Sequence, residues 1–230
     1  MLTGRRRVVR GVTLIELLVA LTIIGLLLFA VLPSVGVWIR NTQVRNTASS
    51  ILSGLQVARN EAIRRNAAVR FSLVSLTDAA VMNDTCALSS TGTSWVVSVR
   101  DPSSHCSYEP VSVSNTDTSD TNSYPNAVAD ANNPLIVDKS AGGVGGRNVV
   151  TCANVRDGSA TADSVTFNGF GRVDNATPIG FIDVTNETLG NDYRRYRIEV
   201  APGGALRMCD LAITSTTDAR YCPTRAIACS

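Results

Sequence analysis

The first feature of the chain is a long apolar stretch near its N-terminus. Residues 17–39 contain no charged side chain. At about 1.5 Å per residue, a helix of this length extends about 35 Å, which exceeds the roughly 30 Å hydrocarbon core of a bilayer. The stretch is longer than the apolar core of a cleaved secretory or twin-arginine signal. The pattern therefore predicts a transmembrane helix within residues 12–39.

The pattern becomes amphipathic after residue 40. Apolar side chains recur at alternating intervals of four and three residues, which places them on one stripe of a helix. The stripe consists of Val44, Ala48, Ile51, Leu55, Ala58 and Ala62. We expect this helix, residues 40–68, to end at about Asn66 and to pack its stripe on a sheet. Four arginines would then face solvent or a partner subunit, namely Arg40, Arg45, Arg59 and Arg64.

The remaining residues, 69–230, show the short alternating runs and turn residues of β-strands. The predicted strands are residues 69–75, 95–100, 164–173, 179–184 and 196–201. A turn at Pro202-Gly203-Gly204 follows the last of them and residues 205–209 return, which predicts a hairpin. A long helix followed by antiparallel strands is typical of the α+β class.

Charge is distributed unevenly along the chain. The net charge is +2, but the first eleven residues hold four arginines and no acid, so the rest carries −2. By the positive-inside rule, the N-terminus lies in the cytoplasm and residues 69–230 lie on the opposite side of the membrane. Residues 40–70 carry +5 and residues 71–230 carry −6. The C-terminal part therefore repels nucleic acid on average, although a local patch can still bind it.

Glu16 is a carboxylate at the start of the apolar stretch. A charged side chain costs about 2.5–3.5 kcal/mol at the centre of a bilayer and less near its surface, so such residues usually mark function. If the chain is cut after Gly11, the new amine of Val12 lies close to the depth of Glu16 in the membrane. The amine of one copy could then neutralise the carboxylate of a neighbour.

The segment RGVTLIELLVALTIIGLLLFAVLP, residues 10–33, resembles the N-terminus of type IV prepilins and type II secretion pseudopilins. The resemblance implies that residues 1–11 are a leader and that prepilin peptidase cuts between Gly11 and Val12 and then methylates Val12. It also implies that Glu16 is the assembly carboxylate and that Pro33 is the kinking proline of the helix. Val12 stands where phenylalanine is commonest, a difference expected to slow methylation.

The same resemblance implies a location and a set of partners. The chain is expected in the bacterial inner membrane, with a single span and a periplasmic head, and later in a pilus or pseudopilus. The implied partners are other pilin or pseudopilin subunits, the prepilin peptidase and methyltransferase, and the inner-membrane assembly platform. No cofactor is implied.

The rest of the chain, from the end of the amphipathic helix through residues 69–230, resembles GspH/FimT-type pilins and their head domain. The resemblance rests on VARNEAIRRN (57–66), SVTFNGFGRV (164–173) and YRIEVAPGGALRMC (196–209). It implies a type IV pilin-like fold in which the long helix packs on an antiparallel, disulfide-containing head. Residues 101–147 stand apart as an acidic insertion, since residues 101–138 hold six acids and no lysine or arginine. We expect a solvated loop there, and a flexible turn at glycine-rich residues 142–146, which lack the lysine of a phosphate loop.

All six cysteines follow the apolar stretch, as expected in an oxidising periplasm. They are Cys86, Cys106, Cys152, Cys209, Cys222 and Cys229. The favoured pairs are Cys86 with Cys106, and Cys209 with either Cys222 or Cys229. His105 is the single histidine and no CxxC occurs, which argues against a zinc site and against a histidine-dependent hydrolase. We therefore expect no metal and no enzymatic activity.

Three functions remain open at this point. The first is a minor pilin that primes assembly at or near the tip of a type IV pilus, favoured by the cysteine-rich head and by its size. The second is the H-type pseudopilin of type II secretion. The third, a DNA-binding pilin for uptake, is less favoured because residues 204–207 read Gly-Ala-Leu-Arg where DNA-binding FimT-type pilins carry Gly-Arg-x-Arg. Its weak candidates are Arg194, Arg195 and Arg207.

Overall fold

The computed structural model describes residues 12–142, 148–188, 190, 192–225, 227 and 229. It divides into two compact units, Met1–Ile39 and Arg40–Ser230. The leader, with Gly11, and residues 143–147 of the insertion lie outside the described residues. The backbone is helical at Pro33, whose side chain also lies outside them.

The first element is helix α1, Leu14–Arg65, which runs through both units. Thr13 caps it, because the Thr13 Oγ1 accepts a hydrogen bond from the Glu16 amide at 3.3 Å. In the first unit, the large apolar side chains of residues 12–28 are 50% to 78% exposed. By a hydropathy and length criterion, no helix among the described residues qualifies as a membrane span.

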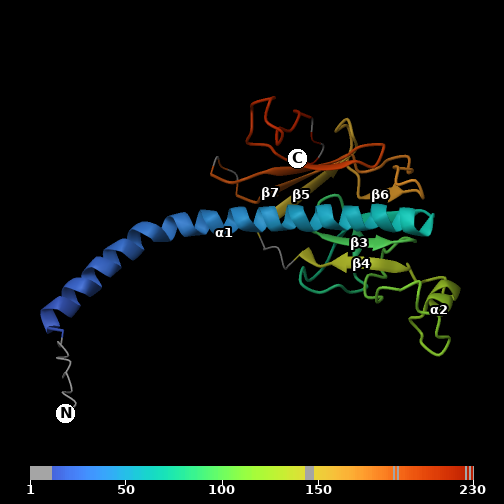
Figure 1. The fold of residues 1–230 in the computed structure, drawn as a ribbon, viewed down its shortest axis with the longest axis horizontal. Coiled ribbons are helices and arrows are strands. Elements are labelled where there is room, and N and C mark those ends of the chain that lie inside the picture. Colours follow the sequence, from blue (N-terminus) through green and yellow to red (C-terminus); the bar gives the residue numbers. More distant parts are fainter. Residues whose placement is uncertain are drawn as a thin grey trace, which may run out of the picture. The chain divides into compact units, whose positions relative to one another are not determined.

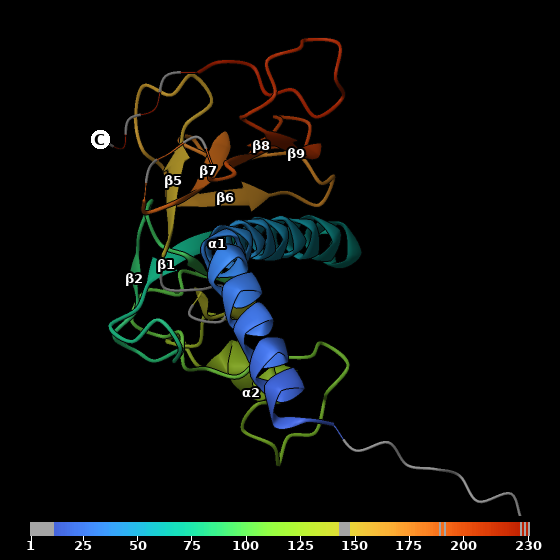
Figure 2. The same ribbon diagram turned by 90° about the vertical axis from the view of Figure 1, so that its left-hand side faces the viewer.

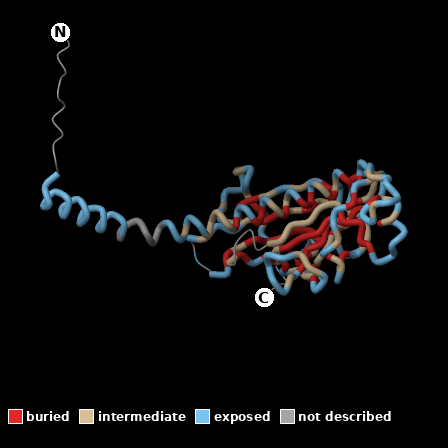
Figure 3. Tube along the Cα trace, turned by 90° about the horizontal axis from the view of Figure 1, so that it is seen from below, coloured by how far each residue is buried: buried red, intermediate tan, exposed pale blue. Residues whose placement is uncertain are grey.

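In the second unit, α1 lies between two antiparallel sheets (Figure 1). The predicted stripe is fully buried at all six positions: Val44, Ala48, Ile51, Leu55, Ala58 and Ala62. The stripe therefore contacts not one sheet, as expected, but a core shared by both (Figure 3).

One sheet is built around β1, Val69–Ser75. β3, Ser94–Ser98, pairs along one side of β1 and itself pairs with β4, Ile136–Ser140. β6, Ser164–Phe167, pairs with Val69–Ser72, and β2, Ala87–Leu88, pairs with the end of β1. The predicted strand 164–173 is shorter than expected because a tight turn begins at Asn168.

The other sheet has the order β5-β7-β8-β9. Its strands are β5 (Val149–Asn154), β7 (Phe181–Asn186), β8 (Tyr196–Val200) and β9 (Leu206–Asp210). β8 and β9 form the predicted hairpin, with Val200 opposite Leu206. Figure 2 shows this sheet on one side of α1, with β1 and β2 on the other.

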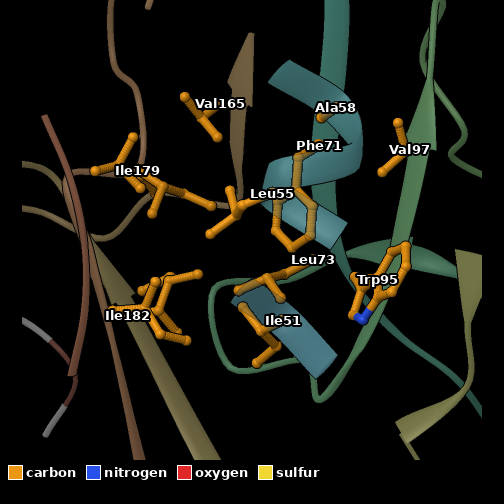
Figure 4. Packing of buried hydrophobic residues seen from close by; sticks show 14 of the residues in the cluster. Ile51, Leu55, Ala58, Phe71, Leu73, Trp95, Val97, Val165, Ile179 and Ile182 are labelled. Carbon is orange, nitrogen blue, oxygen red and sulfur yellow. The ribbon is translucent and has the colours of Figure 1, made fainter. Parts of the chain in front are cut away.

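Large side chains from both sheets meet around α1 (Figure 4). Phe71 and Trp95 stack with ring centroids 5.9 Å apart, and the Trp95 indole donates to the Ser50 hydroxyl at 3.0 Å. Gly54 permits this approach, since a Cβ there would lie 2.8 Å from the Trp95 ring. The absent side chain of Gly54 thus sets how closely α1 approaches β3.

The acidic insertion is more ordered than the solvated loop expected from its composition. Helix α2, Tyr124–Ala129, and β4 both lie in it, and a small core joins Val111, Ala127 and Leu135. The Arg100 guanidinium donates to the carbonyls of Val128, Asp130 and Asn133 at 2.8 to 3.1 Å. An arginine just before the insertion therefore supplies positive charge to residues 128–133, a part of the insertion that has none of its own.

Three disulfides join the six cysteines. They are Cys86–Cys106, Cys209–Cys222 and Cys152–Cys229. The first two agree with pairs favoured from the sequence. The third links residues 77 positions apart and was not anticipated.

Candidate assembly segment and C-terminal sheet surface

The assembly candidates lie at the start of α1. Val12 is 73% exposed, and Glu16 is exposed in the first turn of the helix. Free amide groups give this end of a helix a partial positive charge, which favours a carboxylate. The Glu16 side chain is exposed, while its backbone amide donates to Thr13.

Two of the four helix arginines, Arg40 and Arg59, bind groups of the head rather than facing solvent alone. Arg40 donates to the Thr188 hydroxyl at 3.1 Å and lies over the Tyr193 ring, and the Arg59 Nε donates to the Gly171 carbonyl at 3.2 Å. Arg45 is exposed, as expected. The expectation of a solvated or partner-binding arginine face is therefore wrong for Arg40 and Arg59, because both hold loops against α1.

Glu61 is buried beside two arginines of the same helix. The Arg64 guanidinium donates to both Glu61 carboxylate oxygens at 2.6 and 2.7 Å, and Arg65 donates to one of them. The hydrogen bonds from Arg64 hold the pKa of Glu61 below its ordinary value, against the opposing effect of burial. Arg64 and Arg65, at the C-terminal end of α1, thus neutralise the negative charge of Glu61 in the same helix.

The arginines proposed for DNA differ in their surroundings. Arg194 pairs with Asp210 at 3.1 Å, and Arg207 pairs with Glu199 at 2.6 Å. Arg195 is exposed and has no carboxylate of a described residue within 4.0 Å. Two of the three candidate charges are therefore balanced by neighbouring acids.

An ion pair that the sequence did not reveal lies on the sheet face turned away from α1. Arg197 on β8 stands opposite Asp183 on β7 and binds it through two hydrogen bonds of 2.6 and 2.8 Å. The two side chains are 3% and 6% exposed. The Arg197 guanidinium also lies 4.2 Å from the centre of the Phe181 ring. Nothing in the sequence signals that Arg197 is buried, because the equally polar Arg195 lies only two residues before it and is exposed.

Among the described residues of the head, Phe170 is the most exposed large apolar side chain, at 82%. Its loop is held firmly, because the Asn168 side chain accepts hydrogen bonds from the amides of Phe170 and Arg172. Gly171, at φ +71°, contacts Ile63 and Arg59 of α1 so closely that a side chain would not fit. A rigidly presented aromatic ring is a frequent anchor of protein interfaces.

His105 occupies a local structural position. Its Nδ1 lies 2.8 Å from the Ser103 carbonyl and its ring tilts against Tyr108. Within the described ranges, no three histidine, cysteine or acidic residues are grouped as metal ligands would be.

These features define a type IV pilin-like protein: a methylation-type N-terminus, a long helix and an antiparallel head fastened by disulfides. The chain belongs to the GspH family, because the family model for the type II transport protein GspH matches residues 47–204. The model of the prokaryotic N-terminal methylation motif matches residues 6–32. The chain is thus a pilin-like subunit of the GspH family, whose members are structural and not known as enzymes.

Comparison with solved structures finds the type IV minor pilin FimU of Pseudomonas aeruginosa strain PAO1. The likeness has a TM-score of 0.38 and 14% identity, and it covers 71% of this chain and 90% of that one. No curated protein matches the chain.

Proposed function

We propose that the protein is a minor pilin that enters a type IV pilus and primes assembly at or near its tip. This proposal rests on a contrast between the two units in how far their apolar side chains are exposed. The large apolar side chains of residues 12–28 are exposed, whereas the second unit buries its own apolar stripe completely. An apolar helix of this kind needs a cover, first lipid and then the helices of neighbouring subunits.

Maturation follows from the N-terminal motif. Prepilin peptidase would cut between Gly11 and Val12 on the cytoplasmic side and methylate Val12, leaving residues 12–39 in the inner membrane and the head in the periplasm. Glu16 would then meet the Val12 amine of an adjacent subunit during transfer into the filament. Support for this role is that the Glu16 carboxylate stands in the first turn of α1, one turn from the new N-terminus.

Replacing Glu16 tests the assembly role. Glu16→Leu should insert at least as well as wild type, because it removes a charge from the apolar stretch, yet it should not enter filaments. The measurement is the amount of the protein in sheared pili relative to the amount in membranes. Glu109→Leu, which changes an exposed carboxylate of the insertion, is the matched control. Normal filament entry of Glu16→Leu contradicts the proposed role.

A second candidate is the H-type pseudopilin of type II secretion, favoured by the description of the matching family. The three disulfides and the ordered insertion favour the pilus. A deletion strain separates the two functions. Loss of twitching with normal export of secreted proteins supports the pilus, whereas the opposite result supports secretion.

DNA uptake is the least supported of the three functions. The head carries excess negative charge, and acids pair with Arg194 and Arg207. Phosphate contacts need arginines that are free to release counterions, and Arg195 alone of the three candidates lacks a described carboxylate partner.

A further inference from the structure

The C-terminal segment crosses the outer face of the sheet β5-β7-β8-β9. One row of cross-strand neighbours runs over this face, consisting of Cys152, Asp183, Arg197 and Cys209. Both ends of the row are disulfide-bonded to the C-terminal segment: Cys152 on β5 bonds to Cys229, and Cys209 on β9 bonds to Cys222. We call described residues 222–225, 227 and 229 the strap.

The strap is also held at its middle. The Arg197 Nη1 donates to the Pro223 carbonyl at 3.0 Å, and the Arg225 Nη1 donates to the Arg156 carbonyl at 2.9 Å. The strap therefore rests on the buried ion pair, and the two disulfides keep it across the strands. Such a fastening is more than a chain end needs merely to avoid fraying.

A cavity of about 1040 Å³ lies between the strap, the preceding loop and the sheet. Its apolar lining includes Val150, Leu211, Ile213 and Ile227, and Thr185 and Thr214 are among its polar lining residues. Sites for small molecules commonly enclose about 300–1,000 Å³, with mostly apolar walls and a few polar groups. The cavity is thus of the size and lining that such ligands occupy.

Four charged residues line this cavity, and Arg195 is the one among them without a described ion-pair partner; the others are Asp183, Arg197 and Arg225. Arg195 lines the cavity and also an adjoining hollow of about 520 Å³. Five other arginines of the C-terminal region are paired with acids, namely Arg194, Arg197, Arg207, Arg220 and Arg225. Among the described carboxylates none lies within 4.0 Å of Arg195. Its guanidinium is therefore available to an anion from outside.

We propose that the cavity beneath the strap binds a small amphipathic anion, which has an apolar body and a single carboxylate. Arg195 binds the carboxylate, the hydroxyls of Thr185 and Thr214 donate hydrogen bonds to it, and the apolar body packs against Val150, Leu211 and Ile213. A planar guanidinium binds a carboxylate through two parallel hydrogen bonds, which fixes the orientation of the ligand.

Photo-crosslinking with 4-benzoylbenzoate tests this site, because the probe joins an apolar body to one carboxylate. The full mature protein in detergent is irradiated with the probe, and the labelled peptides are mapped by mass spectrometry. We expect labels in residues 148–154 and 211–225. Arg195→Gln should weaken this labelling about tenfold, as expected for the loss of a charge-assisted hydrogen bond.

Arg194→Gln is the matched control, since it changes the adjacent arginine, which pairs with Asp210 outside the proposed site. It should label like wild type. A second variant, Ile213→Trp, should block labelling by filling the cavity while leaving the three disulfides formed. Labels confined to residues 12–39, or labelling at the strap that is equal in Arg195→Gln and wild type, would overturn the proposal.

Discussion

Replacing Asp183 by leucine removes one half of the ion pair at the centre of the C-terminal sheet. The remaining partner, Arg197, is 3% exposed and cannot reach bulk water without moving the strap. Breaking a buried pair by removing one partner costs about 3–5 kcal/mol, because the other charge stays uncompensated. Arg197 keeps the Pro223 carbonyl and the Phe181 ring. We therefore expect the lower end of this range, about 3 kcal/mol.

The loss is measurable as a change in thermal unfolding. For a domain of 150–250 residues, 1 kcal/mol shifts the Tm by about 2–4 °C, so Asp183→Leu should lower it by about 6–12 °C. The assay is near-ultraviolet circular dichroism of the mature protein in detergent under non-reducing conditions, with stacked Phe71 and Trp95 reporting on the core. Asp218→Leu is the control, because Asp218 pairs with Arg220 at the surface and should leave the Tm unchanged.

A double variant shows whether the uncompensated charge causes the loss. Asp183→Leu combined with Arg197→Met removes both charges and keeps apolar volume, and such replacements are often neutral or stabilising. The double variant should recover most of the lost Tm. A single variant that melts within 2 °C of wild type, or a double variant no more stable than the single, refutes this account of the pair.

Four further predictions concern other regions. Gly11→Val should leave the precursor uncut, so that mass spectrometry of membranes finds the Met1 start, whereas wild type begins at Val12. The lowered pKa of Glu61 stabilises the fold at pH values above the unfolded-state pKa of about 4.5. The Tm of wild type should therefore exceed that of Glu61→Gln by the full amount at pH 7. This difference should vanish as the pH falls through the lower pKa of the folded state. Phe170→Ser should leave the Tm unchanged, because the ring is 82% exposed, but reduce the amount of the subunit in sheared filaments. The mature protein should bind DNA only weakly at ~150 mM salt, with little change on triple alanine replacement of Arg194, Arg195 and Arg207, and sub-micromolar binding lost in that variant would favour the uptake function.

The part of α1 that packs in the head, and strand β1, could be predicted from the sequence because their signals are local. The stripe from Val44 to Ala62 repeats with the period of one helix, and burial at all six positions confirms it. β1 occupies residues 69–75, as predicted, and the β8–β9 hairpin follows a turn of proline and glycines. The N-terminal motif is equally local, since a leader, a glycine and Glu16 lie within one short segment.

Strands β4 and β5 and the order in the insertion were missed because their stability comes from distant partners. β4 lies in a stretch rich in aspartate and asparagine, and it is ordered through pairing with β3 some forty residues earlier. β5 depends on β7, and the Ala153 amide donates to the Ser90 carbonyl. Pattern and propensity within a short window do not contain these pairings.

By itself, the sequence determined the class of protein and the apolar stripe, because motif and spacing along one helix carry that information, and it predicts Val12 and Glu16 as assembly residues. Only the tertiary structure decided which arginines are free. Arg194, Arg195 and Arg197 look alike in the sequence, yet the first pairs at the surface, the second lines a cavity and the third is buried against Asp183. The register of β8 with β7 places Arg197 opposite Asp183, and the strap covers it, whereas Arg194 and Arg195 precede β8 and stay exposed.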